Sequence, residues 1–585
     1  MFRSTRTLAS LIARISFGTA AAVVTTGIVA TTLVGCKDDS QPDYWVDKLA
    51  DGSWRPRAIK RLEQFYEDVI TRSNKDTASP EVKALLDKIS VPLTKAYVDF
   101  YDDYDVKTRV SLIKLLSSFK DPRTEPAIKK AFDEFAKHPK TDKDNADVKW
   151  ASRAAGALKI PALGEPLLQA FMKLRASTML GGVTYKDMNE ALSDMHQQSW
   201  AGPLRTMMDA DIVLPKGGND KDKIDPYRDQ LFWQTTSAKL LGELKDPAAV
   251  EPLLKVMLDP AKADVQMTAL LALVKIGKPV LPEAIKLLKG ENDKLKAFAV
   301  RRAKETGNEK GGDDESLQKT AALILGTLGR AEAIAPMVAM LKTTKSDASK
   351  ALIARELAKL PETNESKEAF KSVFESTTID TTIPPGDAAL QVLAESAGQF
   401  YDPNMIDWLL VRAEKTAGSG DDKTAFQSTV LATVLKLAKP NQIEIVRAAV
   451  KKYGTQMEKD FLGMAEKQLK ACGDRVQCYL SEIEKSENQE QKTQFVAIKA
   501  AYMIGIFGND QARGELIDRL GSIDNAAVRY AASQTIDQLS PKGSKEAAKK
   551  LSMIVEANEK TADSNNIAGD APLKQVMYRI ESRAE

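Results

Sequence analysis

The chain is poor in the residues that build most metal and catalytic centres. Among 585 residues there are two histidines, His138 and His196, and three cysteines. Zinc sites and histidine-dependent catalysis need several such side chains at set spacings. The sequence also has no His-Glu-x-x-His, Walker-type or Gly-x-Ser-x-Gly motif. We therefore expect no catalytic residues, no metal site and no cofactor.

Aromatic residues are scarce as well, at 6% of the chain, and the net charge is almost zero. The formal charge is +3, but Arg3, Arg6 and Arg14 stand in a leader that has no Asp or Glu. The rest of the chain then carries 81 residues of each sign. A nucleic-acid partner would call for a basic stripe, so we expect none. Apolar residues make up 43%, and plentiful Ala, Leu, Lys and Glu favour helices.

The first 35 residues have the composition of a secretory signal. After the arginines comes an uncharged apolar run from Ile15 to Val34, which ends in small residues. Leu33-Val34-Gly35-Cys36 follows and resembles the lipobox of bacterial lipoproteins. The resemblance implies cleavage between Gly35 and Cys36 and fatty acylation of the Cys36 thiol. The alternative is an uncleaved anchor, because a run of about twenty apolar residues can span a bilayer.

Both interpretations place the body of the protein outside the cytoplasm, in the cell envelope. Lys37, which follows the expected lipidated cysteine, is not the Asp that often retains lipoproteins in the inner membrane. We therefore expect the periplasmic face of the outer membrane, with the inner membrane and the cell surface as open alternatives.

The two remaining cysteines, Cys472 and Cys478, lie six positions apart. An oxidising compartment permits a disulfide between them, which would pin a local bend between two helices. A zinc site is less favoured because no histidine stands nearby. A redox-active pair normally has the tighter Cys-x-x-Cys spacing.

Helical units recur along the chain. An Ala- and Leu-rich helix ends at Gly, Lys-Asp-Pro or Gly-Asn-Asp, and a second helix with apolar residues at i, i+3 and i+4 follows. Small residues inside the first helix, such as Gly326, would let neighbouring helices approach closely. The pattern is clearest in four stretches: Ser237–Leu258, Thr268–Leu288, Thr320–Leu341 and Lys499–Leu520.

This pattern resembles the HEAT-repeat superfamily, whose second-type helices often begin with Val-Arg. Asp524, Val528 and Arg529 match that start, and Asp264-Val265-Gln266 matches it with Gln in place of Arg. The resemblance implies an all-α fold: a right-handed superhelical solenoid of HEAT-like helix pairs, of the armadillo type.

The expected organisation has six parts. They are a signal peptide (1–35), a lipidated tether (36–41), N-terminal repeats with an irregular insertion near 175–230 (42–230), clear repeats (231–345), C-terminal repeats (346–555) and a loose tail with a short terminal helix (556–585).

A solenoid offers a long surface that suits partner proteins. We expect a membrane-anchored scaffold or adaptor that binds one or more envelope proteins not identified by the sequence. Two alternatives remain open: a glycan- or peptidoglycan-binding protein that uses an exposed tryptophan such as Trp200, and an enzyme with a site in residues 175–232.

Overall fold

The structure is a computed structural model. It describes residues 38–139, 146–175, 183–215, 221–378, 388–416, 420–484, 491–523, 525–561 and 571–585. Every regular element in this described part is helical, as expected for an all-α chain. The chain divides into two compact units, and the boundary between them falls between Ile89 and Ser90, within helix α3 (Pro80–Asp99).

The first unit contains α1 (Pro42–Asp47), the 3₁₀ turn η1 (Lys48–Ala50), α2 (Arg55–Arg72) and the first half of α3. Arg55, a buried residue at the start of α2, donates from Nε to the carbonyl of Leu49 at 2.8 Å. The guanidinium of Arg57 lies over the rings of Trp45 and Trp54. These contacts join the start of α2 to η1 and α1.

The second unit stacks its helices in two series. Each helix of the first series packs against the next helix of that series, and most helices of the second series do the same. The first series is α4 (Val106–Phe119), α6 (Ala146–Leu158), α8 (Val183–Met195), α10 (Lys221–Glu243), α12 (Ala263–Ile276), α15 (Asp314–Leu328), α17 (Asp347–Leu357), α19 (Ala389–Ser396), α21 (Asp421–Leu437), α25 (Gln491–Phe507) and α27 (Ala526–Gln538).

The second series packs against the first through apolar faces. It contains α5 (Glu125–Lys137), α7 (Gly164–Lys173), α9 (Ala201–Asp209), α11 (Val250–Leu258), α13 (Val280–Lys289), α16 (Ile334–Thr343), α18 (Asn364–Ser376), α20 (Ile406–Lys415), α22 (Ile443–Tyr453), α24 (Val476–Glu484), α26 (Asp510–Leu520) and α28 (Lys545–Thr561). Three more helices are α14 (Asp293–Thr306), α23 (Gln456–Cys472) and α29 (Ala571–Arg583).

Short Asp-Pro turns connect the two series. At Asp121, Asp246 and Asp402 the carboxylate accepts from the backbone N–H two residues later, at 2.9–3.1 Å. The following proline occupies the first position of a 3₁₀ turn, where its missing N–H costs nothing. The residue before each Asp has a positive φ and ends the preceding helix: Lys120, Lys245 and Tyr401.

Close helix packing in the first series depends on Gly326 in α15. A Cβ built on Gly326 would lie 2.7 Å from the Cβ of Glu356 in α17. Real Cβ atoms do not approach this closely, so a larger residue would push the two helices apart. The small residue thus has the packing role that the sequence pattern predicts for it.

An irregular insertion was expected near residues 175–230, and the described part of this range contains helices α8, α9 and the start of α10. Helix α8 packs between α6 and α10, and α9 packs against α10 and α11. The described helices of this range therefore take places in the two series, because contacts with neighbouring helices compensate for the irregular sequence pattern. In the tail expected at 556–585, α28 continues to Thr561 and α29 forms a terminal helix. Residues 562–570 lie outside the described residues.

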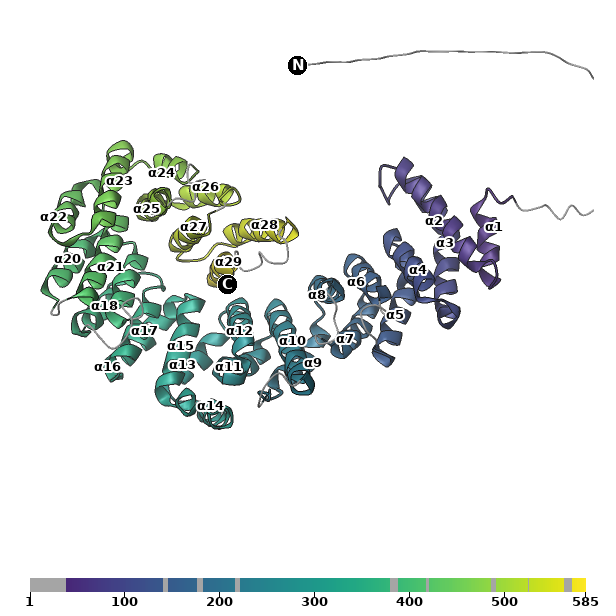
Figure 1. Cartoon of the computed structure of the whole chain (residues 1–585), viewed down its shortest axis with the longest axis horizontal. Coiled ribbons are helices and arrows are strands. Elements are labelled where there is room, and N and C mark those ends of the chain that lie inside the picture. Colours follow the sequence, from purple (N-terminus) through teal and green to yellow (C-terminus); the bar gives the residue numbers. More distant parts are fainter. Residues whose placement is uncertain are drawn as a thin grey trace, which may run out of the picture. The chain divides into compact units, whose positions relative to one another are not determined.

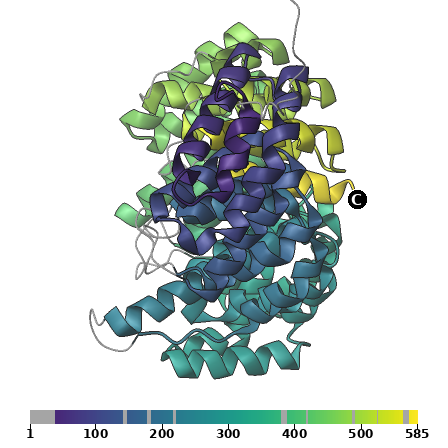
Figure 2. The same ribbon diagram turned by 90° about the vertical axis from the view of Figure 1, so that its right-hand side faces the viewer.

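The second unit follows a curve from α12 to α27, and α29 lies where this curve returns to α12 (Figure 1). In the view turned by 90°, the yellow helices α28 and α29 lie between the green helices above and the teal helices below (Figure 2). No helix of the described residues is long and apolar enough to cross a membrane. The run from Ile15 to Val34 and the expected cleavage site between Gly35 and Cys36 lie outside the described residues.

Candidate functional site

Helix α29 packs on the first series as a separate amphipathic helix. It contacts α12, α15 and α27, and also α28, which precedes it in the chain. Its apolar residues recur at i, i+3, i+4 and i+7, so they lie on one face. All four are at most 7% exposed: Leu573, Val576, Met577 and Ile580. We call the surface of α12, α15 and α27 that α29 covers the α29 seat.

Two arginines one turn apart attach the end of α29 to its seat. The Arg579 and Arg583 guanidiniums lie 3.1 and 3.0 Å from the Asp537 carboxylate, at the end of α27. All three side chains are at most 9% exposed. Burial lowers the pKa of Arg579, while the charge of Asp537 opposes that shift. Each guanidinium therefore depends on Asp537 as its counter-charge in a site with little water.

The same two arginines also bind backbone carbonyls from distant parts of the chain. Arg583 donates from Nε to the Gly329 carbonyl at 2.7 Å, and Arg579 donates to the Lys359 carbonyl at 2.6 Å. These carbonyls follow α15 and α17, where a helix dipole presents its negative end. A row of helix C-termini thus favours cations at this place.

Three further contacts secure the C-terminal end of α29. Arg330 donates to the backbone carbonyl of Ser582, and Lys245 forms ion pairs with Glu581 and Glu585 at 3.2 and 2.7 Å. The Lys245 and Glu581 side chains are each 40% exposed, so water weakens the attraction between their charges. Together these contacts join the turns after α10 and α15 to a helix that is more than 200 residues later in the sequence.

Glycines allow α29 to approach its seat closely. Gly329 has a positive φ of 66°, and a Cβ at this position would lie 2.3 Å from Arg579 Nε. Gly277 is similar, because its Cβ would lie 2.7 Å from Ser582 Oγ. Both glycines end a helix in the positive-φ region, and both leave the space that α29 fills.

Next to the seat, the first series presents polar side chains from successive helices. The negative charge of Glu395, in α19, favours a higher pKa at three side chains: Lys436 in α21, Tyr502 in α25 and Tyr530 in α27. Burial lowers the pKa of Lys436 and raises that of Tyr502 and Tyr530. Tyr530 is nevertheless 48% exposed, so it contacts water although protein surrounds it. At neutral pH both tyrosines are protonated hydrogen-bond donors.

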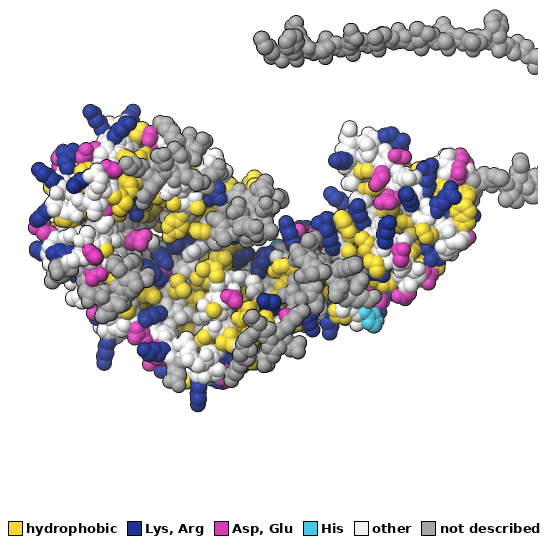
Figure 3. All heavy atoms as spheres, in the orientation of Figure 1, with side chains coloured by type: hydrophobic (Ala, Val, Ile, Leu, Met, Phe, Trp, Pro, Cys, Tyr) yellow, Lys and Arg dark blue, Asp and Glu magenta, His cyan; other side chains and the backbone are white. Residues whose placement is uncertain are grey.

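Charged side chains of both signs appear together on the face of the second unit that Figure 3 shows. Of the two histidines, His196 is half exposed and lies 3.8 Å from Glu243. His138 ends α5 at the surface. Within the described residues, no three His, Cys, Asp or Glu side chains are grouped in a way that could hold a metal ion.

Trp200 is buried, with 0% of its side chain exposed. It lies in the 3₁₀ turn η6 (Gln198–Trp200), directly before α9. A tryptophan that binds a sugar ring has to offer one face to solvent, and Trp200 does not. The burial of Trp200 weakens the glycan-binding alternative at this residue, because the side chain packs into the core of the second unit.

Around residues 175–232, the clearest polar feature is Lys262, which is 1% exposed. Its ammonium donates to the Met208 carbonyl at 2.8 Å. Burial lowers the pKa of Lys262 to about 8. Beside it, Arg302 pairs with Asp259 at 2.9 Å and donates to the Ile212 carbonyl. Lys262 therefore attaches the end of α9 to the start of α12, and Arg302 attaches the chain after α9 to α14. Both side chains stabilise the packing of these helices.

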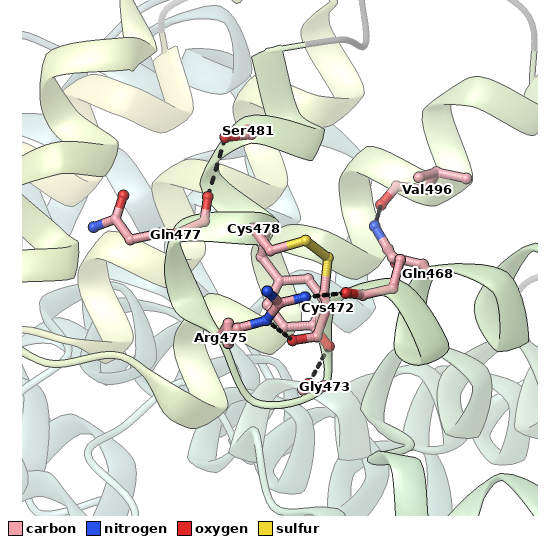
Figure 4. The surroundings of a disulfide bond; sticks show 10 residues. Gln468, Cys472, Gly473, Arg475, Gln477, Cys478, Ser481 and Val496 are labelled. Carbon is pink, nitrogen blue, oxygen red and sulfur yellow. Dashed lines mark hydrogen bonds between the residues drawn. A yellow bond between two sulfur atoms is a disulfide. The ribbon is translucent and has the colours of Figure 1, made fainter.

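Cys472 and Cys478 form a disulfide bond, with sulfurs 2.00 Å apart, at the turn between α23 and α24 (Figure 4). The Tyr479 hydroxyl donates to the Gly473 carbonyl at 2.6 Å inside the same turn. Arg475 also donates to the carbonyls of Ala471 and Cys472. The bond thus reinforces a turn that hydrogen bonds already hold.

Replacing both cysteines by serine should lower the thermal midpoint of the protein. A loop this short contributes about 2 kcal/mol when closed, through reduced chain entropy of the unfolded state. Differential scanning calorimetry measures the change. As a control, a reductant should lower the midpoint of the wild type but not that of the variant. A wild-type midpoint that does not respond to the reductant would contradict this prediction.

The sequence predicts a terminal helix, but it does not predict the seat. Arg579, Arg583 and Asp537 are the residues that sequence reasoning missed. The i, i+4 spacing of two arginines beside an apolar stripe was the available signal, but on most helices such a pair is solvated. Only the fold shows that Asp537 and the carbonyls of Gly329 and Lys359 meet these arginines.

Comparison of the sequence with models of known protein families gives no match, and comparison with curated proteins gives none either.

Proposed function

We propose that the protein is a lipid-anchored, non-catalytic scaffold of the bacterial cell envelope, attached through acylated Cys36. Its body would be a right-handed, HEAT-like solenoid that binds partner proteins on the first series of helices. Residues 1–35 would be a signal peptide that directs export, and the lipid would hold the mature chain at a membrane, with the outer membrane preferred.

One observation carries the proposal: the second unit already binds an amphipathic helix on its first series. The α29 seat combines an apolar surface with a buried carboxylate and helix C-termini. Helix-binding surfaces of this kind recur in protein recognition. The two stacked series supply the long, continuous surface that repeat proteins use for partners.

The lipid anchor is tested by metabolic labelling with a palmitate analogue in cells that express the tagged protein. The wild type should incorporate label and sediment with membranes, and a Cys36→Ala variant should do neither. The matched control, Cys472→Ala with Cys478→Ala, should incorporate label as the wild type does. Label that persists in the Cys36→Ala variant would contradict acylation at this residue.

The scaffold role is tested by crosslinking in native membranes, followed by pull-down of the tagged protein. One dominant partner should be enriched with the wild type and lost with the Cys36→Ala variant. No enriched protein from either form would count against a scaffold.

A further inference from the structure

The chemistry of the α29 seat defines the kind of helix that it accepts. Three of its features come from residues outside α29: the Asp537 carboxylate and the carbonyls of Gly329 and Lys359. All three carry negative charge or partial negative charge, and all three meet guanidinium groups. A planar guanidinium can bind a carboxylate and a carbonyl at once, which a lysine ammonium does with less geometric precision.

The fit between α29 and its seat is incomplete. The Nε atoms of Arg579 and Arg330 are buried and have no hydrogen-bond partner in the described structure. A buried donor without a partner costs free energy that docking has to offset. Arg579 belongs to α29 and Arg330 to the seat, so α29 leaves one donor on each side of the contact unused.

Helix α29 also has the properties of an exchangeable ligand. It has 13 residues, a length at which an isolated helix is only marginally stable in water, so most of its stability comes from the seat. It is joined to α28 through residues 562–570. Such a short tether gives an effective concentration on the order of millimolar, which keeps α29 bound against competitors in solution.

We infer that the α29 seat is a receptor for an amphipathic helix with two arginines one turn apart, and that a partner protein engages the second unit by supplying such a helix in place of α29. The inference depends on the proposed function as a protein-binding scaffold and names the partner's chemistry. In the free protein, α29 occupies the seat and restrains access to it.

The test uses the full chain with a specific protease site placed within residues 562–570. Cleavage leaves every residue present but removes the tether. A fluorescent peptide of residues 571–585 is then added, and its binding is followed by anisotropy. We expect saturable binding to the cleaved chain and at least about 100-fold weaker binding to the uncleaved chain, because the tethered helix competes at millimolar concentration.

Variant peptides test the arginine requirement. A peptide with Arg579→Ala and Arg583→Ala should bind at least about 30-fold more weakly, because it leaves the buried Asp537 carboxylate unpaired. A Gln575→Ala peptide is the matched control and should bind as the wild type does. Equal loss with both variants would overturn the arginine-based recognition.

Two other outcomes would overturn the inference. If the cleaved chain keeps its circular-dichroism signal but takes up no labelled peptide, the seat is not a receptor. If cleavage removes much of the helical signal, α29 is an integral part of the fold. The pull-down from membranes is independent of this exchange, so failure of the inference can be distinguished from failure of the scaffold proposal.

Discussion

Replacing Asp537 by alanine should release α29 from the second unit. The substitution leaves the Arg579 and Arg583 guanidiniums, 2% and 6% exposed, without their shared counter-charge. Removing one partner of a buried ion pair typically costs about 3–5 kcal/mol. Backbone amides of residues 573–583 should then exchange with deuterium at least about 100-fold faster, which hydrogen–deuterium exchange with mass spectrometry measures.

A matched control for this prediction is Asp510→Ala, which breaks the ion pair between Asp510 and Arg513 in α26. Asp510 is 85% exposed, so solvent screens the pair and α29 should exchange as in the wild type.

A second variant separates the effect of charge from the effect of packing. Replacing Asp537 by leucine and both arginines by methionine should restore much of the protection, because it leaves no buried charge unpaired. Wild-type exchange in the Asp537→Ala protein would show that α29 is held by its apolar face alone.

Replacing Trp200 by alanine should destabilise the second unit strongly. The Trp200 side chain is completely buried, so its removal leaves a cavity as well as losing buried apolar surface. Substitutions of this kind cost about 3–5 kcal/mol. Thermal unfolding should show a lower midpoint, and exchange should increase first in α8 and α9, which flank the 3₁₀ turn that carries Trp200.

Trp150 is the matched control. It lies near the surface of α6, under the side chains of Lys114 and Arg153. A partly exposed ring loses little more than its cation–π contacts on truncation, so Trp150→Ala should lower the free energy of unfolding by about 1 kcal/mol.

The same pair of variants tests glycan binding. Loss of binding to muropeptides in a Trp200→Ala protein of unchanged stability would contradict the burial of this residue and revive the glycan hypothesis.

The helices and turns of this chain could be predicted because their causes are local. Asp246-Pro247 shows this directly: the carboxylate caps the backbone two residues on, and the proline starts the next turn. Likewise, the four apolar residues of α29 at i, i+3, i+4 and i+7 predict a helix with one buried face. Neither feature needs information from another part of the chain.

The role of residues 175–230 could not be predicted in the same way. Their Gly, Met and Trp content weakens the repeat pattern, and the sequence alone therefore favours an insertion. The structure shows that α8 and α9 still occupy places in the two series, since neighbouring helices supply the packing that the local pattern lacks. Whether Trp200 is exposed or buried could not be predicted either, because burial depends on which helices surround the residue.

The sequence by itself determined that the chain is helical and where most turns fall, since propensity, capping and apolar periodicity act over a few residues. It also carries the lipobox-like Leu33–Cys36 segment, which remains a prediction about export and anchoring. Only the tertiary structure decided what α29 does. The hydrogen bonds of Arg579 with Lys359 and of Arg583 with Gly329 span 220 and 254 positions of sequence. No local pattern encodes such contacts, because they arise from the curvature that all the helices between them build together.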